Sequence, residues 1–163
     1  MMITISKFFA TLATGLLAGS FLYGLLNLVP TFYEVPMDVH LIFRTQLMNH
    51  NSTTMQLLML ISILMPLWYA ILHRKVKPVM FSSLVASLLA LTALLVTRFG
   101  NVPINQMMKT WSINDLPVDW KILLHNWDQY NLIRCMAGIG SFICVVISTH
   151  LAFLKLTSNQ TKL

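Results

Sequence analysis

Residues 79–96 read VMFSSLVASLLALTALLV, an apolar stretch that contains no charged side chain. A helix needs about 20 predominantly apolar residues to cross a lipid bilayer, so this stretch is nearly long enough to be a membrane span by itself. Three further apolar runs lie at about residues 8–29, 55–72 and 133–154, and none of them contains an acidic residue. The chain is therefore predicted to be all-α, with a bundle of four transmembrane helices.

The composition supports the same class of protein. Of the 163 residues, 56% are hydrophobic and only 10% are charged, whereas soluble domains carry about 25% charged residues. The length fits one domain, so residues 1–163 are expected to form a single integral membrane domain. An alternative for the first apolar run is a signal peptide cleaved near residues 18–20, but the run continues well past that point.

Charge is divided unequally between the two sides of the predicted bundle. The N-terminus, the connection at residues 73–77 and the C-terminus share six basic residues and no acids, namely Lys7, Arg74, Lys75, Lys77, Lys155 and Lys162. The two longer connections lie at about 30–54 and 97–132. Together with Arg134, which follows directly after the second, they contain five basic residues and all five acids. The positive-inside rule places both termini in the cytoplasm, in what we expect to be a bacterial inner membrane. Topology explains the net charge of +6, so we expect no nucleic-acid partner.

The outer connection at residues 30–54 is long enough to have structure of its own. Asp38 follows a proline and is a suitable N-cap for a short interfacial helix, which the polar run at residues 49–52 is expected to break. His40 and Arg44 are four residues apart, so they share one face of that helix. This face either lines a site at the membrane surface or is the solvated polar stripe of an interfacial helix.

The second outer connection also predicts a helix, because Pro117 and Asp119 form a helix-start signal ahead of the fourth span. From there, six residues recur at intervals of three or four and share one helix face: Trp120, Leu124, Trp127, Asn131, Arg134 and Gly138. Polar groups on this shared face are expected to point between helices, where they mark a site or an interhelical hydrogen bond. The alternative is a snorkelling arginine beneath a belt of interfacial tryptophans.

The sequence gives little support for a metal or redox centre. Histidines and acids occur in both outer connections, but no pair has the His-x-x-x-His or Glu-x-x-His spacing of a helical metal site. Cys135 and Cys144 lie on opposite faces of one predicted helix, which excludes a disulfide between them. We therefore expect no metal ligands, and the residues alone identify no cofactor.

Several spaced elements in the second half resemble one known family. They occur in the order Asn101-Val102-Pro103-Ile104-Asn105, Trp111, Pro117-x-Asp119-Trp120, Trp127, Asn131 and Arg134. This pattern is similar to that of the anthrone oxygenase-like membrane family, a domain of unknown function, and the similarity is strongest over residues 97–140. Many bacterial members have histidine at the position of Asn131. The resemblance implies a four-span membrane fold and, for fungal members, the oxidation of anthrones to anthraquinones.

The resemblance implies a membrane oxygenase that acts on a lipophilic phenol, anthrone or quinol at an outward-facing site. In this hypothesis Arg134 and Arg44 stabilise an enolate, Asn131 orients its oxygens, and His40 is the base. The expected substrate-binding residues are Asn101, Asn105, Trp111, Trp120 and Trp127.

The alternative is a non-enzymatic accessory or ligand-binding membrane protein, in which the same polar side chains tie the outer connections to the helices. The expected partners are the lipid bilayer and a lipophilic small molecule. Assembly as a homo-oligomer or with a membrane partner subunit stays open. A transporter is a weaker third option, because the predicted spans contain few groups for an ion relay.

Overall fold

The structure is a computed structural model that describes residues 1–160, and within this range the chain is almost entirely helical. In chain order, with η for a π-helical turn, the elements are α1 (Met2–Tyr23), η1 (Gly24–Leu28), α2 (Val29–Glu34), α3 (Met37–Leu72), α4 (Lys77–Val96), η2 (Thr97–Asn101), α5 (Val102–Met108) and α6 (Trp120–Gln160). The only β-type pairing among these residues is an isolated bridge between Ser112 and Asp115. The predicted all-α fold is confirmed.

Four helical stretches are long and apolar enough to cross a membrane. They are Met2–Glu34, Thr53–Leu72, Lys77–Met108 and Trp120–Lys155. Each contains one of the predicted spans, and three of them are much longer than the apolar run that predicted them. The expected outer connections are therefore mostly helical extensions of the spans.

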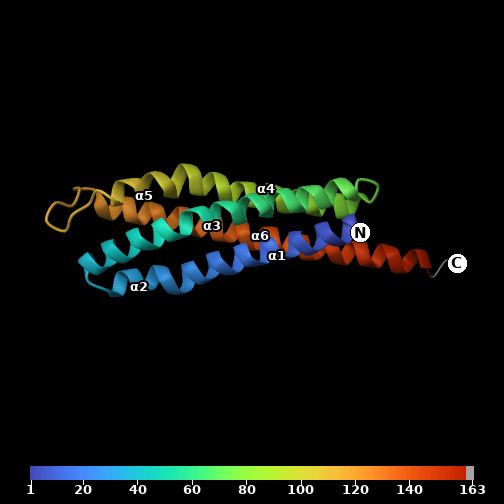
Figure 1. The fold of residues 1–163 in the computed structure, drawn as a ribbon, viewed down its shortest axis with the longest axis horizontal. Helices are drawn as coiled ribbons and strands as arrows, with labels where there is room; N and C mark the ends of the chain where they lie inside the picture. Colours follow the sequence, from blue (N-terminus) through green and yellow to red (C-terminus); the bar gives the residue numbers. More distant parts are fainter. Residues whose placement is uncertain (161–163) are drawn as a thin grey trace.

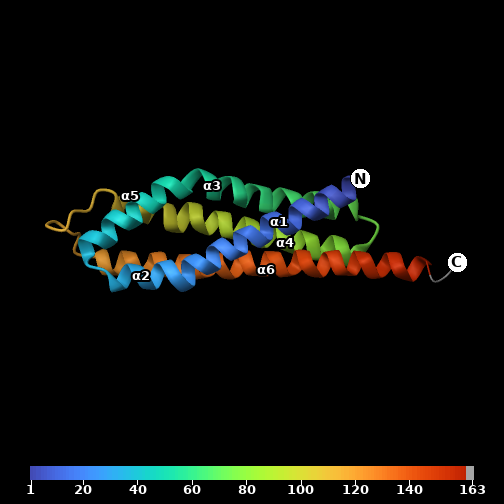
Figure 2. The ribbon, with the colours of Figure 1, turned by 60° about the horizontal axis from the view of Figure 1, so that its bottom comes forward.

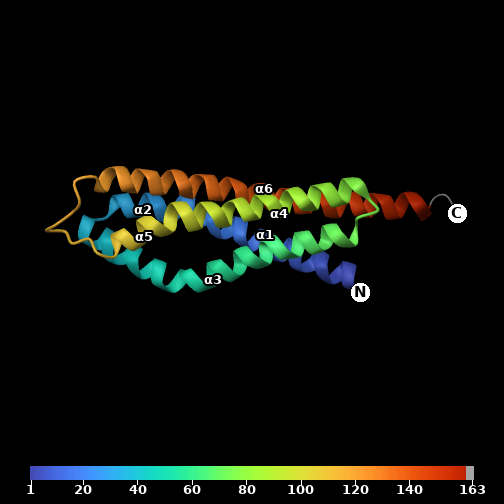
Figure 3. The same ribbon diagram turned by 90° about the horizontal axis from the view of Figure 1, so that it is seen from above.

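The four long helices close into a ring (Figures 1 to 3). α1 packs against α3 and α6, and α4 packs against the same two helices. Ala10, Ala86 and Ala90 are completely buried, and such small side chains allow the helix backbones to approach closely. Large apolar side chains such as Phe81 and Leu88 point outward, as expected of a surface that faces lipid.

One prediction about the first outer connection is wrong. The run at residues 49–52 does not break the helix, because α3 continues from Met37 to Leu72. Residues 37–65 contain neither proline nor glycine, and asparagine, histidine and serine each cost a helix only a few tenths of a kcal/mol. The expected short interfacial helix is thus the first part of a long one, which carries both His40 and Arg44.

Two π-helical turns interrupt the helical stretches: η1 lies between α1 and α2, and η2 lies between α4 and α5. η1 is followed directly by Val29-Pro30 and η2 by Val102-Pro103. A proline has no N–H and its ring clashes with the carbonyl four residues earlier, which lies within the preceding π turn in both cases. The proline therefore accounts for the widened turn, and such turns occur frequently at functional sites.

The two ends of the molecule differ in charge. The start of α1 and the end of α6 lie at the end of the molecule that holds the α3–α4 connection (Figure 1). The opposite end, which we call the acid-rich end, holds the α2–α3 and α5–α6 connections and all five acids: Glu34, Asp38, Asp115, Asp119 and Asp128. The basic Lys162, which entered the topology prediction, lies outside the described residues.

Candidate functional site

One face of α6 points into the ring near the acid-rich end. Leu124, Trp127, Asn131 and Gly138 are buried, and Arg134 is half-buried between them. The prediction that these residues share an inward face is confirmed. His125, on the opposite face, is exposed.

The Asn-Val-Pro-Ile-Asn segment clamps η2 and α5 to α6. The Asn101 side-chain amide donates to the Trp127 carbonyl at 3.0 Å, and the Trp127 indole N–H donates to Asn105 Oδ1 at 2.7 Å. Gly100 completes the clamp, because a Cβ at this position would lie 2.6 Å from the Tyr130 ring. Asn101 is completely buried in this contact, whereas Asn105 and Trp127 also line the cavity described below.

Arg134 is fixed by its neighbour one turn earlier. Its Nε and Nη2 donate to Asn131 Oδ1 at 3.0 and 2.7 Å. The guanidinium lies 4.9 Å from the centre of the Phe21 ring and 5.5 Å from that of Trp127. No carboxylate within residues 1–160 forms an ion pair with Arg134. Its positive charge is therefore positioned but not neutralised.

Arg44 is the second cation of the site, and its side chain is only 2% exposed. Its guanidinium lies 4.0 Å from the centre of the Trp127 ring, its Nη1 lies 3.2 Å from His40 Nε2, and its Nη2 lies 3.8 Å from Asp128 Oδ1. The Tyr33 hydroxyl donates to the other oxygen of Asp128. The contact between Arg44 and Asp128 is an ion pair, and its 3.8 Å distance is too long for a hydrogen bond.

His40 contacts the Arg44 guanidinium but does not line the cavity described below. It lies between the rings of Phe32 and Tyr33, with ring centres 5.5 and 5.6 Å away. Burial, and secondly the charge of Arg44, hold the pKa of His40 below its ordinary value of 6.5. The imidazole is therefore neutral at pH 7, and its Nε2 accepts a hydrogen bond from Arg44.

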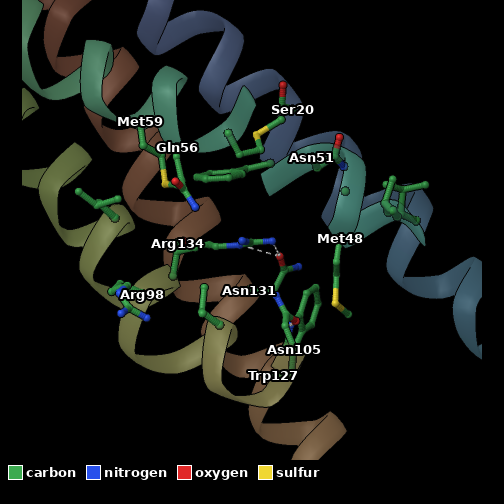
Figure 4. Close-up of a pocket in the computed structure, with 18 of the residues that line it drawn as sticks. Ser20, Met48, Asn51, Gln56, Met59, Arg98, Asn105, Trp127, Asn131 and Arg134 are labelled. Atoms are coloured by element: carbon green, nitrogen blue, oxygen red, sulfur yellow. Dashed lines mark hydrogen bonds between the residues drawn. The ribbon is translucent and has the colours of Figure 1, made fainter. Parts of the chain in front are cut away.

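A cavity of about 520 Å³ lies among all four long helices at this level (Figure 4). Arg44, Asn131 and Arg134 form its polar head, and Figure 4 shows Arg134 pointing toward Asn131 within it. The remaining wall is mainly apolar and includes both π turns; it contains Phe21, Leu28, Met48, Met55, Met59, Leu60, Leu94, Leu95 and Phe99. Leu60, Leu95 and Phe99 are also exposed on the outer surface of α3, α4 and η2, so the cavity reaches the lipid-facing side.

The polar head keeps donors that the protein does not use. Arg44 Nε and Nη2 and Asn131 Nδ2 are buried, and none of them has a hydrogen-bond partner among residues 1–160. A buried donor without a partner costs about 1–3 kcal/mol. Because the Asn131 oxygen already accepts from Arg134, its amide nitrogen is fixed as a donor. These donors match a ligand that brings an oxygen acceptor.

The other predicted site residues lie around this cavity. His40 does not line it, since Arg44 lies in front. Trp111 and Trp120 pack in a neighbouring apolar cluster with Ile104 and Met108 rather than on the cavity. Arg98 lines the cavity from η2.

Sequence reasoning missed the residues that come from distant parts of the chain. Asp128 pairs with Arg44 across 84 positions, and Phe21 stacks on Arg134 from α1. Neither has a local pattern that marks it. Gln56 and Asn51 add polar atoms to the cavity wall from α3. Asn51 lies within the run that was expected to end the helix, and Gln56 lies near the start of the predicted second span. Within the described chain, no three His, Cys, Asp or Glu side chains come together as a metal-binding group.

The fold and the cavity define a helical membrane protein with an apolar internal cavity and a cationic polar head. The family model for anthrone oxygenase matches residues 44–144, which is more than half of the chain, and the chain therefore belongs to the anthrone oxygenase family. The matched range includes the clamp and the whole polar head. Comparisons with curated proteins and with solved structures return no match.

Proposed function

We propose that this protein is a membrane oxygenase for a lipophilic phenol, anthrone or quinol that binds in the cavity with its acidic oxygen at the polar head. The observation that carries the proposal is the set of unused donors on Arg44 and Asn131, beside the unneutralised charge of Arg134. Membership of the anthrone oxygenase family supports the reaction class.

The size and lining of the cavity suit such a substrate. A volume of about 520 Å³ is within the range of pockets that hold ligands of several rings. The apolar wall accommodates the rings, and Trp127 offers an aromatic surface beside the polar head. Access from the bilayer between α3 and α4, past Leu60, Leu95 and Phe99, is consistent with a substrate that partitions into lipid.

The chemistry requires the protein mainly to stabilise an anion. Loss of a proton from an anthrone methylene gives an enolate, and Arg134, Arg44 and Asn131 stabilise the negative oxygen. The enolate carbon transfers electrons to dioxygen and forms a C–O bond. The resulting peroxide anion takes up a proton from the solvent to give a hydroperoxide, which loses water to give the carbonyl. The overall change is CH₂ plus O₂ to C=O plus H₂O, so no other reductant is needed.

The position of His40 changes the role that the sequence suggested for it. Among the described residues that line the cavity there is no histidine, aspartate or glutamate, so the proton leaves to the solvent and the site acts by lowering the pKa of the substrate. His40 holds the Arg44 guanidinium in position, and it is a positioning residue in this mechanism.

The topology prediction completes the proposal. By the positive-inside rule, the acid-rich end lies on the outer side of a bacterial inner membrane and both termini lie in the cytoplasm. The polar head then lies near the outer surface. The basic residues at the opposite end, such as Arg74 and Lys75, support this orientation.

A non-enzymatic ligand-binding role is the second candidate. It is favoured by the lack of an acid–base residue on the described cavity lining and by the clamp, in which Asn101 and Asn105 serve the packing of α5 on α6. In this case the cavity holds the same class of ligand without transforming it.

Oxygen uptake distinguishes the two functions. The purified full-length protein in lipid nanodiscs is supplied with a hydroxyanthrone, and uptake is measured with an oxygen electrode. Arg134→Gln should lower the rate about 100-fold, because it removes one stabilising donor of the anion. The matched control is Arg74→Gln at the opposite end, which should retain the rate. The oxygenase proposal is rejected if the wild type consumes no oxygen above background, and binding without uptake favours the second function.

A further inference from the structure

Three charged side chains meet at the polar head or directly behind it. Arg44 and Arg134 contribute two positive charges, and Asp128 contributes one negative charge. Asp128 is the only acid of the described chain within ion-pair distance of either guanidinium. Arg98 also lines the cavity, but its side chain is exposed. The buried charges at the polar head therefore sum to about +1 before a ligand binds.

The other titratable groups near Asp128 do not alter this balance. Tyr33 donates a hydrogen bond from α2 and is neutral, and His40 on α3 is neutral behind Arg44. Lys121 and His125 share a surface hollow with Asp128 on α6, but both are exposed. Solvent screens them far more than it screens the buried Arg44.

Asp128 offsets the positive charge of Arg44 but accepts no hydrogen bond from the Arg44 guanidinium. One carboxylate oxygen is held by Tyr33, whereas Oδ1 is buried 3.8 Å from Arg44 Nη2 and has no hydrogen bond. Asp128 does not line the cavity. Its effect on a ligand therefore passes through the field at the polar head and not through contact.

We propose that Asp128 is a specificity-determining residue that sets the charge of the polar head, so that the cavity accepts one monoanion. An enolate or phenolate brings the site to neutrality, whereas a dianion such as a phosphate monoester leaves an excess buried negative charge. The inference rests on the proposed function for the location of the ligand's acidic oxygen. It adds the charge that this ligand must have.

The ionisation of a bound probe tests the charge balance directly. The probe is an alkyl nitrophenol, whose phenolate absorbs at longer wavelength than the phenol, bound to the protein in nanodiscs and titrated with base. Asp128→Asn should raise its ionisation constant about tenfold, and Arg44→Gln should lower it about tenfold, as expected for single charges at this range. The double variant should return it to within about threefold of the wild type.

Lys121→Gln is the matched control, because it removes a neighbouring exposed charge and should leave the ionisation constant unchanged. The double variant also guards against misfolding, since it removes both partners of a buried pair at once. If the probe binds but its ionisation does not respond to Asp128→Asn, or responds in the opposite direction, the inference is overturned. A probe that ionises as expected in a protein without oxygen uptake supports the charge balance and rejects only the oxygenase.

Discussion

Two halves of the helix ring treat their buried polar groups differently. In the serine half, where α4 and α6 meet around Ser83, Ser141 and Ser148, hydroxyls bond across helices at 2.6 to 3.0 Å. In the cavity half, Arg44, Asp128 and Asn131 each keep a buried polar atom without a hydrogen-bond partner. The first half contributes stability. In the second half, the unused donors of Arg44 and Asn131 remain available to a ligand, which is a common cost of function.

The largest effect should come from the Arg44–Asp128 pair. Asp128→Ala leaves a buried guanidinium without its counter-charge, and we expect it to lower the free energy of unfolding by about 3 kcal/mol. Arg44→Met combined with Asp128→Leu should instead raise it by about 1 kcal/mol while abolishing activity. Unfolding in mixed detergent micelles measures both. If the double variant loses as much unfolding free energy as Asp128→Ala, then the buried ion pair does not lower the stability of the cavity half, and this prediction is wrong.

The next effect tests the clamp that borders the cavity. Gly100→Ala places a Cβ 2.6 Å from the Tyr130 ring, and such overpacking costs about 1–3 kcal/mol of unfolding free energy. Gly19→Ala is the matched control on α1, where nothing lies within 4 Å of the added Cβ. This control should be neutral or stabilising by up to about 1 kcal/mol. Equal losses in the two variants would contradict a specific contact between Gly100 and Tyr130.

A smaller effect is expected in the serine half. Ser141 donates to the Ala86 carbonyl at 2.8 Å, and Ser141→Ala should lower the unfolding free energy by about 0.6 kcal/mol, the average for interhelical hydrogen bonds in a membrane protein. Thr92→Ala, whose hydroxyl bonds only within α4, provides the comparison. If Ser141→Ala weakened the protein as much as Asp128→Ala, the division between the halves would not hold.

The sequence was informative where structure depends on local periodicity. The apolar runs predicted the four spans, and the three- and four-residue spacing from Trp120 to Gly138 predicted the inward face of α6. The continuity of α3 through residues 49–52 could not be predicted, because polar residues are compatible with either a helix or a loop. The cavity itself depends on contacts between distant segments, such as Arg44 with Asp128, which no local pattern encodes.

The smallest expected effect is a pH dependence confined to the cavity half. His40 has a lower pKa in the folded protein than its ordinary value of 6.5, so the unfolded chain binds its proton first. The stabilisation is complete above about pH 6.5 and declines as the pH falls below it. Thermal unfolding between about pH 7.5 and pH 5 should show this slope. His40→Gln, which retains an acceptor for Arg44 but does not titrate, should flatten it, whereas the exposed His125→Gln should not. An unchanged slope in His40→Gln would assign the pH dependence to another group.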